Sequence, residues 1–130
     1  MEKLKLVFNR YRDGVGYNEE AKFQFGKTAQ SYLKKLSEAL GATDRKISWN
    51  KGGIAVSGDV TLKAMLTPEK GVYIDISHPC QHGIMFRSIT SLKDHKGGKN
   101  EWFTIEQFKN YQDLANHIRR MINEDRTQSN

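Results

Sequence analysis

The sequence predicts an α+β domain built on an antiparallel sheet. Three observations support this fold class. Apolar and polar residues alternate, with the period of a strand, through most of residues 46–90. Short glycine- and proline-containing segments interrupt the alternation, and strands joined by short turns pair antiparallel. Two other segments carry apolar residues three and four apart, which indicates helices with one buried stripe.

The N-terminal third is expected to contain a hairpin followed by a helix. Alternation over residues 3–12 and again over 18–25, with a turn signal between them, predicts two paired strands. Residues 28–40 then carry an amphipathic stripe. Thr28 is the expected N-cap of this helix, and Gly41 the left-handed residue that follows it.

The middle of the chain is expected to form a curved four-stranded meander. Its strands lie near residues 46–49, 54–66, 72–77 and 83–90, with a proline-containing turn at 67–71. A glycine inside the second strand indicates a bend or bulge. We expect the even-numbered apolar side chains to form the core and the odd-numbered face to be open.

A C-terminal helix is expected to start at Ile105. Thr104 and Gln107 have the spacing of a capping box, while Phe103 and Phe108 occupy the positions of a hydrophobic staple. Asn110 with Asp113 can restart this helix. Its predicted buried stripe consists of Tyr111, Leu114, Ile118, Met121 and Ile122.

Length and composition limit the class of protein. The chain has 130 residues, which predicts one domain over residues 1–126 and a frayed tail over 127–130. It contains no apolar run near the roughly 20 residues of a membrane span, and its start lacks the features of a signal peptide. Cys80 is the single cysteine, so an intramolecular disulfide is impossible. These features predict a cytoplasmic protein without a cofactor.

A net charge of +6 favours contact with phosphates, although the same charge can simply keep a small protein soluble. Lysines surround a Gly-Gly pair before Trp102, and the odd face of the sheet adds further cations and an aromatic. Cations that neutralise phosphates, together with aromatics that stack on bases, are how several small domains bind single strands. The residues expected to bind nucleic acid are Lys46, Lys51, Lys63, Tyr73, Arg87, Lys93, Lys96, Lys99 and Trp102.

Metal and enzymatic sites are alternatives. His78, Cys80, His82 and His95 could hold a transition metal, but their spacing is not that of a standard structural zinc site. Cys80 beside a histidine could be a nucleophile–base pair. Common hydrolase and nucleotide-binding motifs are absent from the sequence, so we expect a non-enzymatic protein.

A further carboxylate pair and a protein-binding role stay open. Asp59 and Asp75 fall on one sheet face, where they could pair with each other or bond to neighbouring cations. Met65, Met85 and Ile89 on the odd face would, if exposed, suit a partner surface or a homodimer contact.

The segment Gly71-Val-Tyr-Ile-Asp-Ile-Ser77, the Lys96-Gly-Gly-Lys99 loop and the helix start at Trp102–Phe108 together resemble PC4-type single-stranded-DNA-binding proteins. The resemblance covers about half the chain. It implies that Lys63, Tyr73, Arg87 and Lys99 line a DNA-facing sheet. That family has no counterpart of residues 1–45 or of the His/Cys loop.

The glycine-rich stretch before Val60 is also similar to small phage and plasmid proteins. The leading expectation is therefore a single-strand-binding protein. The alternative is a phage or plasmid inhibitor that binds a host protein or sequesters a small signalling molecule.

Overall fold

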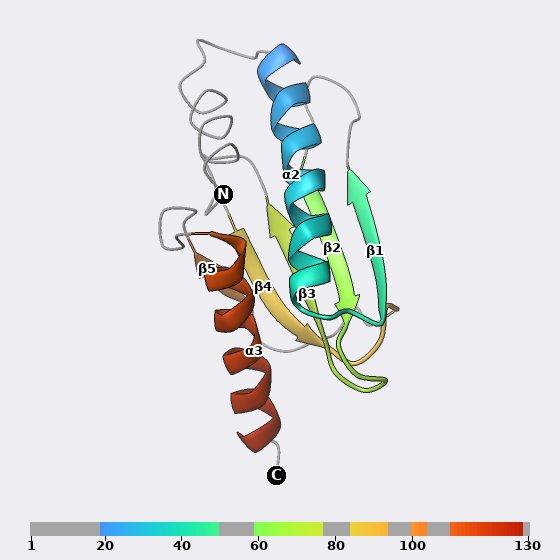
Figure 1. Ribbon diagram of the computed structural model, residues 1–130, viewed down its shortest axis with the longest axis vertical. Helices are drawn as coiled ribbons and strands as arrows, with labels where there is room; N and C mark the ends of the chain where they lie inside the picture. Colours follow the sequence, from blue (N-terminus) through green and yellow to red (C-terminus); the bar gives the residue numbers. More distant parts are fainter. Residues whose placement is uncertain (1–18, 50–58, 77–83, 94–99, 104–109, 129–130) are drawn as a thin grey trace.

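The computed structural model describes residues 19–49, 59–76, 84–93, 100–103 and 110–128. Its elements in chain order are α2 (Glu19–Ala39), β1 (Asp44–Trp49), β2 (Val60–Met65), β3 (Gly71–Ile76), β4 (Ile84–Ile89), β5 (Glu101–Phe103) and α3 (Tyr111–Gln128). The strands form one sheet in the order β1-β2-β3-β4-β5, and every neighbouring pair is antiparallel (Figure 1). The predicted α+β class with an antiparallel sheet is confirmed.

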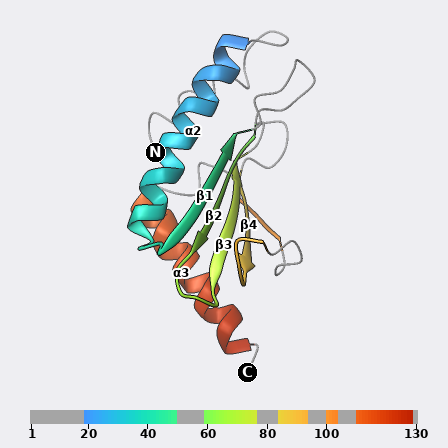
Figure 2. The ribbon, with the colours of Figure 1, turned by 90° about the vertical axis from the view of Figure 1, so that its right-hand side faces the viewer.

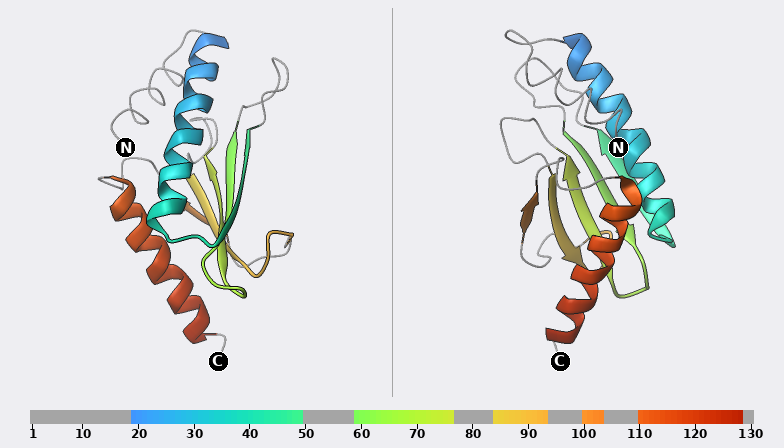
Figure 3. Two further views of the ribbon diagram at one scale, coloured as in Figure 1. Left: turned by 45° about the vertical axis from the view of Figure 1, so that its right-hand side comes forward. Right: turned by 60° about the vertical axis from the view of Figure 1, so that its left-hand side comes forward.

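The helices α2 and α3 lie on the same side of the sheet, and no helix of the described residues lies on the other side (Figures 2 and 3). The core fills the space between these layers, and its strand residues are the even-numbered ones that the alternation predicts. The fully buried strand side chains include Val60, Leu62, Ile74, Ile76 and Phe86. Burying each large apolar side chain contributes about 1.5–3 kcal/mol, so this face of the sheet is fixed toward the helices.

The turn between β2 and β3 sets the register of the central hairpin. The amides of Leu66 and Thr67 both donate to the carbonyl of Lys70, at 2.9 and 3.0 Å. Thr67 Oγ1 in turn accepts from the Lys70 amide at 3.0 Å. Because this turn is closed by its own hydrogen bonds, Lys63 is placed directly opposite Tyr73.

The prediction of a strand over residues 18–25 is wrong, because α2 begins at Glu19. Alternation would place Phe23 and Phe25 on the same face, yet Phe23 is 49% exposed and Phe25 is fully buried. Phe25 instead starts the helical stripe of α2. Thr28 consequently lies inside the helix and does not cap it. The predicted strand over 3–12 lies outside the described residues.

The stripe of α2 begins at Phe25, four residues before Ala29, where the sequence pattern places its start. It consists of Phe25, Ala29, Tyr32, Leu33, Leu36 and Leu40, all buried. Gly26, next to the start of this stripe, costs helix stability of about 0.5–1 kcal/mol relative to alanine. A Cβ there would collide with the ring of Trp49, so the glycine allows β1 to approach the helix closely.

The C-terminal end of α2 follows the prediction. Gly41 has a φ of 70°, the left-handed region that favours glycine. The Gly41 amide donates to the carbonyl of Glu38 at 3.0 Å, and the Ala42 amide donates to that of Ser37 at 3.0 Å. This pair of bonds is a Schellman motif, which satisfies carbonyls that the helix leaves unpaired.

The helix α3 starts where Asn110 was expected to restart it. Asn110 Oδ1 accepts from the Asp113 amide at 2.9 Å, which is an N-cap bond. Among residues 111–122 of the helix, the buried ones are Leu114, Ala115, Ile118, Met121 and Ile122, which confirms most of the predicted stripe. The Arg119 guanidinium donates to the Ala39 carbonyl and so links α3 to the end of α2.

The segment before α3 is only partly as expected. Phe103, predicted at a helix staple position, belongs to the short strand β5 and stacks on Phe86 with ring centres 4.9 Å apart. This fifth strand was not predicted. The expected helix start at Ile105 lies outside the described residues. No helix in the described part of the chain combines the length and apolar character needed to cross a membrane.

Candidate nucleic-acid interface

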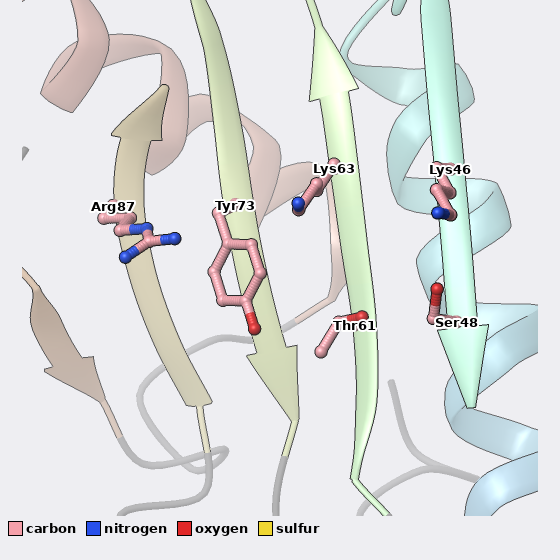
Figure 4. Close-up of a pocket in the computed structure, with 6 residues that line it drawn as sticks. All are labelled: Lys46, Ser48, Thr61, Lys63, Tyr73 and Arg87. Carbon is pink, nitrogen blue, oxygen red and sulfur yellow. The ribbon is translucent and has the colours of Figure 1, made fainter. Parts of the chain in front are cut away.

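Four of the predicted site residues form a straight row across the open face of the sheet. Lys46 on β1 pairs in register with Lys63 on β2, Lys63 pairs with Tyr73 on β3, and Tyr73 pairs with Arg87 on β4. Residues paired in this way point to the same face of an antiparallel sheet. The row therefore crosses four strands on the face opposite the helices (Figure 4). We call it the basic row.

The basic row lines a hollow of about 280 Å³, together with Ser48 and Thr61. Ser48 follows Lys46 by two residues and pairs with Thr61 in the next register row. Neither hydroxyl was predicted as a site residue. The signal that could have found them is the alternation itself, because both fall on the same face as Lys46 and Lys63.

Tyr73 lies between the two cations on its neighbouring strands. The Arg87 guanidinium carbon is 4.6 Å from the centre of the tyrosine ring, and Lys63 Nζ is 6.0 Å from it. Figure 4 shows both side chains reaching toward the ring from opposite sides. Cation–π contacts of this kind contribute about 0.5–1 kcal/mol at exposed sites, so the ring helps to orient both charges.

Lys63 is also anchored to the chain after β4. Its Nζ donates to the Leu92 carbonyl at 3.2 Å. The structure therefore brings the segment after β4 next to the basic row. Lys93, a predicted site residue, follows Leu92 in this segment and is exposed.

A carboxylate pair lies beside the basic row. Asp75 follows Tyr73 by two residues on β3, and its side chain hydrogen-bonds to Asp59. Burial, which is the largest cause, together with the neighbouring Asp59 charge and the hydrogen bond with Asp59, raises the pKa of Asp75 to about 7. The sequence left open whether these acids pair with each other or with cations, and the structure brings the two acids together.

The same environment keeps Tyr73 protonated. Burial raises the pKa of its hydroxyl, and the charges of Asp75 and Asp59 act in the same direction, while Arg87 lowers it. The hydroxyl can therefore donate a hydrogen bond throughout the physiological pH range.

Removing the charge of Asp75 is expected to stabilise the protein increasingly as the pH rises. The folded state binds the Asp75 proton more tightly than the unfolded chain does, so stability falls as pH rises from about 4 to about 7. Asp75→Asn retains a hydrogen-bonding group and abolishes this cost. After allowance for solvent screening, we expect a gain of about 1–2 kcal/mol at pH 8 and less than half of that gain at pH 5.

Urea unfolding at the two pH values measures this effect. Asp44→Asn is the matched control, because Asp44 is exposed on β1 of the same sheet. A gain for Asp75→Asn that is equal at pH 5 and pH 8 would contradict the assigned ionisation.

The predicted apolar patch on the open face is not exposed. Met65, Met85 and Ile89 have exposed fractions of 6%, 8% and 1%. Met65 and Ile89 both pair with Gly71, and a Cβ at Gly71 would lie 2.6 Å from the Met65 sulfur. Because the glycine lacks a side chain, Met65 folds over it. These three side chains therefore do not form the exposed partner or dimer surface that the sequence suggested.

The remaining predicted residues have different outcomes. Trp102 lies on β5, is 49% exposed and pairs with Met85, so it points to the open face next to the strand of Arg87. The predicted site residues Lys51, Lys96 and Lys99 lie outside the described residues. So do the metal alternatives His78, Cys80, His82 and His95. Within the described ranges, no group of three or more His, Cys, Asp or Glu residues could hold a metal ion.

Comparison of the chain with protein-family models, with curated proteins and with solved structures gives no match in any of the three.

Proposed function

We propose that this protein binds nucleic acid non-enzymatically, with a preference for single strands, through the open face of its sheet. The observation that carries the proposal is the basic row, in which three cations and a tyrosine align across four strands. Phosphates supply most of the affinity in such complexes, and an accessible aromatic supplies a stacking surface for an unpaired base. Trp102, half-exposed on the same face, is that aromatic.

The dimensions of the basic row favour a short contact. Neighbouring strands lie about 4.8 Å apart, so Lys46 and Arg87 are separated by roughly 14 Å across the sheet. This length fits only a few phosphates, and the aromatics beside it need bases that are not already stacked in a duplex. The resemblance to PC4-type proteins supports the same use of the sheet. The apolar residues that favoured a host-protein partner are buried, which removes the observation behind that alternative.

A binding experiment over a range of salt concentrations tests the proposal. Each phosphate neutralised on a single strand contributes about −0.7 to the slope of log K against log[salt], so three cations predict a slope near −2. Affinity for a labelled single strand should fall roughly 20-fold between about 50 and 200 mM salt, as measured by fluorescence anisotropy. A duplex of the same sequence is the control. Undetectable single-strand binding at the lowest salt, or equal affinity for the duplex, would overturn the proposal.

A further inference from the structure

The hollow of the open face is lined by side chains that can all donate hydrogen bonds. Its described lining residues are the cations Lys46, Lys63 and Arg87 and the hydroxyl residues Ser48, Thr61 and Tyr73. None of these six is a carboxylate. A lysine or arginine has no acceptor, and the raised pKa of Tyr73 keeps its proton in place. The ligand group that complements such a lining carries negative charge and only accepts hydrogen bonds.

A phosphate at the end of a chain fits this lining better than one inside a chain. A phosphomonoester carries about −1.5 to −2 charges at pH 7 and presents three strong acceptor oxygens. An internal phosphodiester carries one charge and has only two oxygens that are not part of the chain. Lys63 and Arg87 approach from either side of the Tyr73 ring, with Lys46 on the next strand, so three charges act on one small volume.

The surroundings of the hollow limit how a strand can continue. On one side, Asp75 and its partner Asp59 would repel further phosphates. On the other side, Met65 and Ile89 are buried, and Leu92 is bonded to Lys63. Phosphates that run parallel to the β-strands are therefore disfavoured in both directions. The direction left open to the nucleic acid runs across the β-strands.

Trp102 lies across the strands from the hollow, displaced from the basic row into the register row of Asp75 and Met85. It belongs to β5, one strand beyond Arg87, and pairs with Met85, two residues from Arg87. Diagonal neighbours of this kind are about 7–8 Å apart, within reach of a large aromatic. A phosphate held in the hollow would leave the base of the same nucleotide near the half-exposed indole.

From these contacts we infer that the hollow binds the terminal phosphomonoester of a strand or of a free nucleotide, in preference to an internal phosphodiester. The inference rests on the proposed function for its class of ligand. The recognised chemistry is the dianionic end group, with an adjacent base placed on Trp102. A strand end and a free nucleotide share this chemistry and are separated by the experiment.

The experiment compares one single-stranded sequence with a 5′-phosphate, a 3′-phosphate or two hydroxyl ends, and adds a nucleoside monophosphate as a separate ligand. Dissociation constants are measured by titration calorimetry at low salt without magnesium. We expect one of the phosphorylated strands to bind about five- to tenfold more tightly than the hydroxyl strand, because it gains a second charge in the hollow. The preferred end, 5′ or 3′, shows the direction in which the strand leaves the hollow.

Tyr73→Phe tests the lining without changing any charge. This variant retains the ring beneath Arg87 and loses one donor, so the preference for the phosphorylated end should fall about threefold. Binding of the hydroxyl strand should fall by a smaller factor, because its internal phosphates present fewer acceptor oxygens to the hydroxyl that is lost. Tyr111→Phe is the matched control, because Tyr111 lies on α3, on the opposite side of the sheet.

The outcomes separate this inference from the proposed function. Equal affinity for phosphorylated and hydroxyl ends overturns the inference and leaves single-strand binding intact. Binding of the monophosphate without binding of any strand supports the inference and overturns the proposed function, with a free nucleotide as the ligand. Absence of binding for all three strands and for the monophosphate overturns both the inference and the proposed function.

Discussion

Replacing Phe86 with alanine is expected to destabilise the protein by about 3–5 kcal/mol, the usual cost of removing a fully buried phenylalanine. Phe86 is 0% exposed at the centre of β4. Its ring stacks on Phe103 at 4.9 Å and lies 6.3 Å from the His117 ring of α3. One side chain therefore joins β4 to the edge strand β5 and to a helix. A domain of this size is stable by about 5–15 kcal/mol, so the loss is a large part of the total.

Thermal and urea unfolding measure this loss. Phe23→Ala is the matched control, since Phe23 is 49% exposed and contacts the Trp49 ring at 5.8 Å between centres. We expect the control to cost less than about 1 kcal/mol. If both variants were destabilised equally, the assignment of Phe86 to the core and Phe23 to the surface would be wrong.

The part of the fold best predicted from the sequence is the run of β2, β3 and β4. These strands were predicted because one face of the sheet meets helices and the other does not, which imposes strict alternation. Their short connection at Pro68 also determines that Lys63 faces Tyr73. Alternation therefore predicts the face on which each residue of the basic row lies, and the short turn predicts that Lys63 is the neighbour of Tyr73.

The elements that were missed depend on contacts between distant parts of the chain. Alternation of Ala21, Phe23 and Phe25 is too short to distinguish a strand from a helix. The helix continues through Gly26 because Trp49, more than twenty residues later, packs on the glycine. Strand β5 has only three residues, which is too few to show any periodicity.

The electrostatics of the site also could not be predicted from the sequence. Alternation placed Asp59 and Asp75 on one face but could not say whether each would meet an acid or a cation. The burial of Met65 follows from the space above Gly71, which a pattern of apolar and polar residues does not record. Such features decide which part of the open face is available to a ligand, and they appear only once the side chains are packed.

Replacing Lys46, Lys63 and Arg87 together with glutamine is expected to reduce single-strand affinity about 100-fold at roughly 0.1 M salt. Each phosphate contact on a single strand contributes about 0.7 of a decade at that salt concentration, so three contacts contribute about two decades. The slope of log K against log[salt] should fall toward zero in the same variant. Fluorescence anisotropy measures both quantities, and circular dichroism checks that the fold is retained.

The matched control replaces Lys27, Lys34 and Lys35 with glutamine. These lysines are exposed on α2, in the layer opposite the basic row. Both triple variants lower the net charge from +6 to +3, so they have the same net charge and differ in where the charge is removed. We expect the control to lose less than about threefold in affinity, because distant exposed charges are screened within about 10 Å at 0.1 M salt.

The comparison between the two variants decides what kind of binding the protein has. A large loss in the basic-row variant alone means that phosphates contact the open face directly, at positions set by the register of four strands. Equal losses in both variants mean that the protein attracts polyanions through its overall charge and has no defined site. An unchanged affinity in the basic-row variant excludes this face as the interface. Lys46 is exposed on β1, and the described cations against the Tyr73 ring are Lys63 and Arg87. Lys46→Gln alone should therefore lower affinity about fivefold without disturbing the fold.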